Sequence, residues 1–116
     1  MEFANFAVAL GLLATPAFAH HSFQAQYDDM QTTSVTGIVT KVQWQNPHVR
    51  VNVDVKGEQP GAGMVWELEL DSPNMLLSQG WKLDSLKPGQ QITAKGARAR
   101  DGSNALRARS ITLAAR

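Results

Sequence analysis

The chain has 116 residues, with 11 Lys and Arg against 10 Asp and Glu, and 43% of its residues are hydrophobic, a composition typical of one soluble domain. It contains no cysteine. This excludes disulfides, thiolate metal sites, iron–sulfur clusters and cysteine nucleophiles, because each of these needs sulfur. Any metal must therefore bind through histidine, carboxylate, methionine or a terminal amine.

Residues 1–19 have the pattern of a signal peptide. Residues 6–14 form an apolar run too short to span a bilayer, and Ala17 and Ala19 are the small residues of a cleavage site. We expect cleavage after Ala19, export to the periplasm, and no stable membrane span in the mature chain. Glu2 stands where Lys or Arg is usual, which leaves a retained N-terminal helix as the alternative.

The first part of the mature chain divides into an arm and a strand. Residues 20–33 are polar and have no period, so we expect an extended arm laid over the core of a barrel domain that spans residues 34–116. Residues 34–44 are rich in β-branched side chains and predict the first strand. Gly37 lies within this strand, where a bulge or bend would fit.

Two alternating segments follow and predict a hairpin. Valine occupies every second position of residues 49–55, the pattern of a half-buried strand, and this places His48 on the polar face with Arg50 and Asp54. Residues 64–70 alternate in the same way and form the third predicted strand. Its two glutamates, Glu67 and Glu69, are expected on a solvated face.

A short helix and two strands complete the chain. Ser72 and Pro73 favour a helix start, which predicts a helix over residues 74–79 that stops at Gly80. Residues 91–97 and 105–113 predict the last two strands, joined by a turn at 101–104. The apolar side chains expected to plug one end of the sheet are Met75, Leu76 and Trp81.

The predicted class is mainly β, a small five-stranded OB-like barrel with one short helix between the third and fourth strands. An open meander sheet is the alternative. Two motifs, His-His-Ser-Phe at 20–23 and Trp-Gln-Asn-Pro-His at 44–48, resemble those of a family of small exported bacterial proteins classed as a domain of unknown function. The resemblance implies export and a small β-barrel, and it brings no established activity or catalytic residue.

The three histidines of the chain, His20, His21 and His48, are candidate ligands of one metal ion. After cleavage His20 would offer its α-amine and imidazole as a chelate, and His21 or His48 would add a third nitrogen. Cu(II) suits such a nitrogen set. Asp54 or Glu67 is expected to orient His48. Cleavage after Ala17 would instead give a copper motif with a third-position histidine, and histidines that bind nothing are the competing interpretation.

An alternative function uses the uneven charge of the chain. Residues 82–116 carry eight basic and two acidic residues, whereas residues 20–81 carry three basic and seven acidic ones. A metal-independent module would bind a protein partner or an anionic ligand through an aromatic and arginine face. Its expected residues are Trp44, Arg98, Arg100, Arg107 and Arg109. We expect a periplasmic protein partner and no nucleic acid, because an exported protein rarely meets it.

Enzymatic motifs are absent from the sequence. It has no nucleophile elbow, phosphate-binding loop, dinucleotide fingerprint or zinc-protease helix. The carboxylate pairs, Asp28 with Asp29 and Glu67 with Glu69, fall in the expected arm and on a solvated strand face. We therefore expect a non-catalytic binding or accessory protein, with copper as its candidate ligand and no other cofactor.

Overall fold

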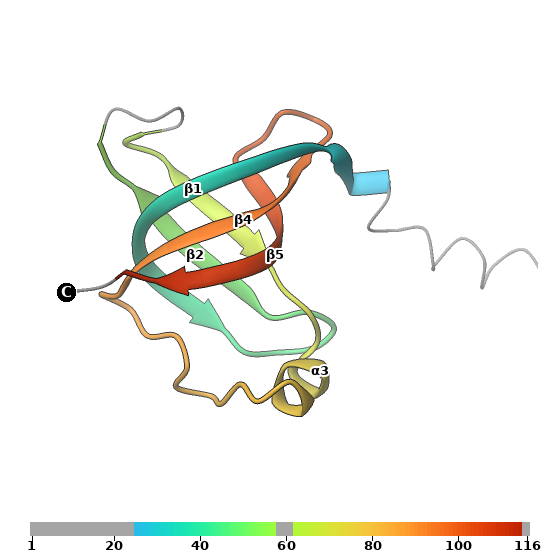
Figure 1. The fold of residues 1–116 in the computed structure, drawn as a ribbon, viewed down its shortest axis with the longest axis vertical. Coiled ribbons are helices and arrows are strands. Elements are labelled where there is room, and N and C mark those ends of the chain that lie inside the picture. Colours follow the sequence, from blue (N-terminus) through green and yellow to red (C-terminus); the bar gives the residue numbers. More distant parts are fainter. Residues whose placement is uncertain (1–24, 58–61, 115–116) are drawn as a thin grey trace, which may run out of the picture.

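The computed structural model describes residues 25–57 and 62–114. Within them, five strands and one short helix follow the order β1 (Tyr27–Gln43), β2 (Arg50–Val55), β3 (Val65–Glu69), α3 (Pro73–Ser78), β4 (Gln91–Ala99) and β5 (Ala105–Leu113). The sheet closes on itself in the spatial order β1-β2-β3-β5-β4 (Figure 1). The predicted mainly β class, the five-stranded ring and the position of the helix are confirmed.

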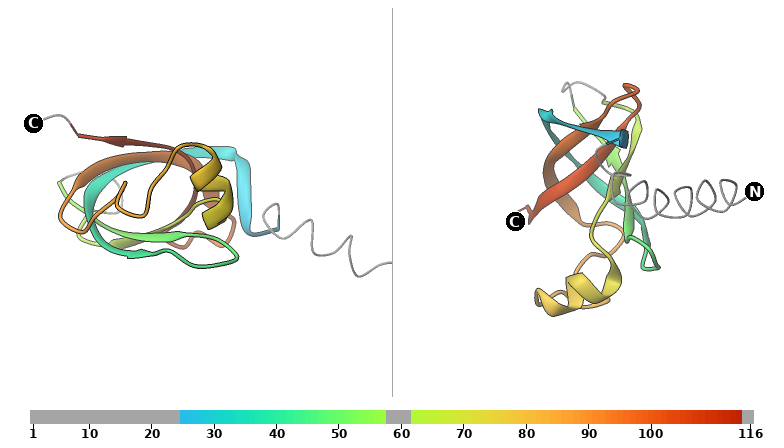
Figure 2. Two further views of the ribbon diagram at one scale, coloured as in Figure 1. Left: turned by 90° about the horizontal axis from the view of Figure 1, so that it is seen from below. Right: turned by 90° about the vertical axis from the view of Figure 1, so that its right-hand side faces the viewer.

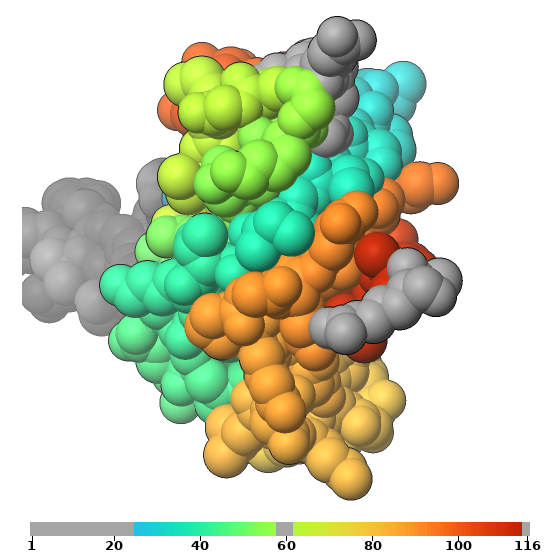
Figure 3. Space-filling model, turned by 90° about the vertical axis from the view of Figure 1, so that its left-hand side faces the viewer, coloured from blue at the N-terminus to red at the C-terminus, as the bar shows by residue number. Residues whose placement is uncertain are grey.

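Four of the five strand contacts are antiparallel, and the fifth closes the ring. β1 pairs with β2 and with β4, β2 pairs with β3, and β4 pairs with β5, all antiparallel. β3 and β5 pair in parallel over three residue pairs only, from Glu67 and Ala105 to Glu69 and Arg107. β1 and β4 also lie side by side on the surface (Figure 3).

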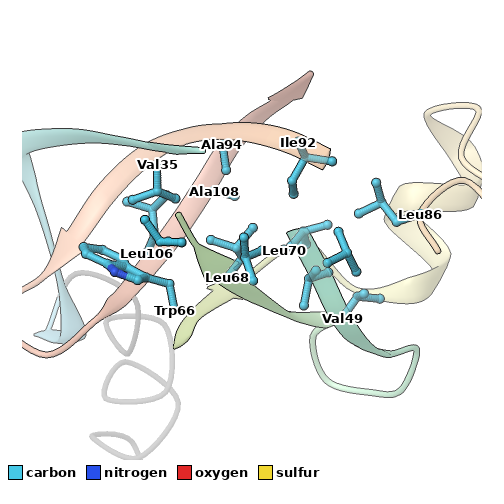
Figure 4. Packing of buried hydrophobic residues seen from close by; sticks show 14 of the residues in the cluster. Val35, Val49, Trp66, Leu68, Leu70, Leu86, Ile92, Ala94, Leu106 and Ala108 are labelled. Carbon is cyan, nitrogen blue, oxygen red and sulfur yellow. The ribbon is translucent and has the colours of Figure 1, made fainter. Parts of the chain in front are cut away.

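The core fills the ring with the alternating apolar residues of its strands. The four valines from Val49 to Val55 are all fully buried, as their spacing predicted. Large side chains from the other strands meet them in the middle of the ring (Figure 4). They include Trp66, Leu68, Ile92 and Leu106.

The helix lies at one end of the ring (Figure 2). It spans Pro73–Ser78, one residue earlier than predicted, and Ser72 caps it as expected, because the Ser72 side chain accepts a hydrogen bond from the Met75 backbone nitrogen at 3.3 Å. Leu76 is buried beneath it and Trp81 packs against the core. Met75 does not plug this end, because its side chain points outward and is 52% exposed.

The expected arm is corrected over residues 27–33, which belong to β1. Tyr27 pairs with Ala99 and Thr33 with Gly96, so β4 supplies the partner that a local pattern does not reveal. Residues 20–24 of the expected arm and the whole expected signal peptide lie outside the described residues. The irregularity in β1 is also displaced from Gly37, since the register shift against β2 falls between Val39 and Lys41.

Gly96 provides a test of the sheet packing. A Cβ atom at this position would lie 1.9 Å from the Arg107 carbonyl oxygen on β5. Because that contact is to backbone, Gly96→Ala must push the two strands apart, and we expect a loss of about 3 kcal/mol in the free energy of unfolding. Urea denaturation measures it, with the exposed neighbour Lys95→Ala as control. Equal stability of the two variants would contradict this packing.

Candidate functional site

The loop between β1 and β2 holds His48 on a rigid support. Its Asn46–Pro47 peptide bond is cis. The residue after His48, Val49, makes two backbone hydrogen bonds to the residues that follow β3. Its nitrogen donates to the Asp71 carbonyl at 3.1 Å, and its carbonyl accepts from the Leu70 nitrogen at 2.8 Å. A hollow of about 200 Å³ opens beside this loop. It is lined by Gln43, Gln45, Asn46, Pro47, His48 and Arg50.

Glu69 is the buried charged residue of the described chain, and it faces this loop. It is 4% exposed, although we expected a solvated face for both strand glutamates. Its carboxylate lies 3.9 Å from His48 Nδ1 and 3.5 Å from an Arg50 guanidinium nitrogen. A carboxylate removed from water needs such partners, since an unpaired buried charge is costly. The expectation of a solvated Glu69 is therefore wrong, while Glu67 is half-buried.

Arg107 binds the backbone of Glu69. Its guanidinium donates to the backbone carbonyl of Glu69 at 3.3 Å and to the side chain of Asp71. Arg107 also stands opposite Glu69 in the β3–β5 register, as Arg50 does in the β2–β3 register. Glu69 thus lies between two arginines and one histidine.

Tyr27 brings the start of β1 to the same region. It is buried in a small apolar cluster with Ala97, Ala99 and Ala105, separate from the main core. Ala105 is the register partner of Glu67. The pKa of Tyr27 is raised to about 12, mainly by burial and also by the charges of Glu69 and Glu67, while Arg50 and Arg107 act in the opposite direction. Tyr27 and His48 therefore share Glu69 as an electrostatic neighbour.

Only one of the three expected metal ligands lies within the described residues. His48 is in place, whereas His20 and His21 lie outside the described residues. The carboxylate beside His48 is that of Glu69, not that of Asp54 or Glu67 as expected. Asp54 pairs with Lys56 at 2.8 Å instead. Among residues 25–57 and 62–114, no three His, Asp or Glu side chains come together as a metal site.

The residues of the expected alternative face are largely engaged by other parts of the barrel. Trp44 packs against the core and is half-buried. Arg98 lies over the ring of the buried Trp66, with 5.0 Å from its guanidinium carbon to the ring centroid. Arg109 pairs with Asp29 of β1, and Arg107 is engaged as described. Arg100 is exposed beside the β4–β5 turn.

Most of the chain matches one known protein family. A family of unknown function, DUF6152, matches residues 9–107. The chain belongs to this family. No curated protein matches the DUF6152 chain. No helix in the described parts of the chain is long and apolar enough to cross a membrane.

Solved structures show that the DUF6152 chain has an OB-like β fold. The mitochondrial single-stranded DNA-binding protein of S. cerevisiae superimposes with a TM-score of 0.54 at 10% identity, over 72% of this chain and 92% of that one. A small single-stranded DNA-binding protein of Streptomyces coelicolor gives 0.51 at 17% identity, over 72% and 91%. Proteins of this function are typically built on OB folds.

One expectation about partners is overturned by these structures. From the expected export of the chain we expected no nucleic acid as a partner. The structural neighbours of the DUF6152 chain are single-stranded DNA-binding proteins, which contradicts that expectation. At 10% and 17% identity the likeness establishes the shared fold, and function must be argued from the residues of this chain.

Two residues of the site were missed from sequence, Glu69 and Tyr27. The signal for Glu69 lies in the hairpin register, which pairs Arg50 with Glu69 once the two strands are aligned. Tyr27 gives no comparable local signal, because its partners Ala97, Ala99 and Ala105 lie about seventy residues later in the chain.

Tyr27 is the one tyrosine of the sequence, so its ionisation can be followed alone. Ultraviolet titration of the phenolate should give a midpoint near pH 12 instead of 10.0. In Glu69→Gln the midpoint should fall but stay above 10.0, because burial is the larger cause. Folding favours the neutral phenol, so its stabilising contribution is complete below pH 10 and is lost as pH rises towards 12. A midpoint at the ordinary value would contradict the burial of Tyr27.

Proposed function

We propose that the chain is an exported, non-catalytic binding protein that holds Cu(II) between its mature N-terminus and the β1–β2 loop. The ligands are His20, with its α-amine, His21 and His48. The observation that carries the proposal is the position of His48 Nδ1, which lies 3.9 Å from the buried carboxylate of Glu69, beyond hydrogen-bond distance. Histidines that bind metals commonly donate one ring nitrogen to a carboxylate, so we propose that Nδ1 closes on Glu69 when Nε2 binds the metal.

The start of β1 supports the participation of the N-terminal histidines. Tyr27 is anchored in the electrostatic neighbourhood of Glu69, beside which His48 lies. His20 is seven residues before Tyr27. An extended chain spans at most about 3.3–3.6 Å per residue, so His20 has a reach of roughly 24 Å from this anchor. We infer that this reach brings an N-terminal chelate to His48, because Tyr27 and His48 have Glu69 as a common electrostatic neighbour.

The donor chemistry favours Cu(II) over other divalent ions. An α-amine and imidazoles form a nitrogen-rich set, and Cu(II) binds such ligands most strongly among the divalent first-row metals. The amine loses its proton near pH 8, so a metal displaces that proton at small cost in neutral solution. The carboxylate of Glu69 adds negative charge close to the proposed site, although Glu69 itself is not one of the metal ligands.

Cu(II) titration of the mature protein, with its His20 terminus verified by mass, tests the proposal. We expect one equivalent to bind with sub-micromolar affinity and to give a nitrogen-rich electron paramagnetic resonance spectrum. His48→Ala and N-terminal acetylation should each abolish that spectrum, and Glu69→Gln should weaken binding about tenfold or more. Gln45→Ala, a change in the same loop, is the matched control. Binding indifferent to His48 would refute the site.

A second candidate is the binding of a single-stranded nucleic acid as an anionic ligand. The likeness to single-stranded DNA-binding proteins favours it, together with the exposed residues Arg100 and Arg109 near the end of the β4–β5 hairpin and on β5. Half-buried Trp44 supplies an aromatic surface of the kind that stacks on bases. This interaction would need no metal, which separates it from the copper site.

Fluorescence anisotropy of a labelled oligothymidylate tests this candidate in the presence of a chelator. We expect the logarithm of the affinity to fall with the logarithm of salt concentration, by about 0.7 for each phosphate neutralised. Arg100→Ala should weaken binding and reduce that slope, whereas Lys41→Ala on β1 should leave both unchanged. Anisotropy that stays flat at low salt would remove this candidate and leave the copper proposal untouched.

A further inference from the structure

β5 has an open edge beyond the point where the ring closes. β3 pairs with β5 only as far as Arg107, whereas β4 accompanies β5 to Leu113. In the described part of the chain, residues 109–113 therefore have a strand on one side only. Figure 2 shows this end of β5 running on beside β4 towards the C-terminus.

The backbone groups along this edge can be assigned from one hydrogen bond. The Ala114 nitrogen donates to the Gln91 carbonyl at 3.0 Å, so Ala114 faces the β4 side. Neighbouring residues of a strand direct their backbone groups to opposite sides. The N–H and C=O groups of Ile111 and Leu113 therefore face the open side, where they can form hydrogen bonds with a further strand.

The side chains do not protect the edge against pairing. Residues 110–113 contain neither a charge nor a proline, the usual devices against edge association. The nearest charge, on Arg109, pairs with Asp29, and its side chain remains 56% exposed. Leu113 is 50% exposed. Two hollows of about 240 and 320 Å³ lie next to this edge; Trp81 and Ile111 line both, and Leu113 lines the second.

We propose that a second copy of the chain pairs with this edge, β5 against β5, in an antiparallel twofold dimer. Leu113 is half exposed, and a hollow that it does not line is bordered by Arg109, Trp81 and Ile111 next to the same edge. In an antiparallel pair centred on Ile111, the twofold axis brings each Leu113 to Arg109 of the other copy, and so to that hollow. Ile111 then lies opposite the partner's Ile111, and Leu113 lies opposite the partner's Arg109. The dimer is independent of the copper and nucleic-acid proposals.

Sedimentation equilibrium of the purified protein with its natural N-terminus tests the assembly, and a pair of substitutions tests the register. The unaltered protein should have the mass of a dimer. Leu113→Lys should shift it to monomer, because the lysine meets the partner's Arg109, whereas Leu113→Glu should remain a dimer. Both variants lose the same apolar side chain, and they differ chiefly in the sign of the charge that replaces it. A monomer at every concentration, or equal behaviour of the two variants, would overturn the proposal.

A cross-link gives a second, independent measurement, because the chain has no cysteine of its own. Residues directly opposite in a hydrogen-bonded antiparallel pair have Cα atoms about 5.5 Å apart, within the range of a disulfide. Oxidised Ile111→Cys should therefore run as a covalent dimer on a non-reducing gel. Lys41→Cys, exposed on β1, should stay monomeric. Equal cross-linking of both variants, or of neither, would overturn the register.

Discussion

The short parallel contact between β3 and β5 is the constraint on which the rest of the molecule depends. Three residue pairs close the ring, and Arg107 reinforces them by bridging the Glu69 carbonyl and the Asp71 side chain. Because β3 then turns away into α3, the closure stops after Arg107. On one side of this point Glu69 is enclosed between cationic side chains, and on the other β5 continues with one neighbour. The buried carboxylate and the open edge both follow from where the closure stops.

Local pattern was sufficient for most of the fold. The valine alternation of residues 49–55 placed β2 correctly, β5 was predicted with its observed bounds, and Ser72 with Pro73 located the start of α3. These elements were predictable because the sequence patterns that define them, alternation in strands and a cap before a helix, extend over only two to four residues. The start of β1 was not, since its partner in β4 lies far along the chain.

The candidate site was predictable only in part for the same reason. His48 was found because it stands at a proline turn beside the clearest strand. Glu69 looked like a solvated residue, since its alternation with Leu68 and Leu70 says which face it occupies but not what covers that face. Arg50 and Arg107 flank it from two different strands, and His48 lies beside it from the β1–β2 loop. The likeness to single-stranded DNA-binding proteins describes the shared scaffold and carries no information about these side chains.

The pairing of β1 with β4 also affects how the chain acquires its structure. One edge of β1 can pair with β2 as soon as the next few residues are available, but the other edge needs residues as distant as Ala99. Domains dominated by such distant strand pairs fold slowly, in milliseconds to seconds, because the ends of a long loop must meet before any bond forms between them. A chain made from its N-terminus therefore carries its longest strand with one side unsatisfied until nearly all of it has emerged. During that interval β1 is the segment most open to aggregation, and the part of the protein that would gain most from a chaperone.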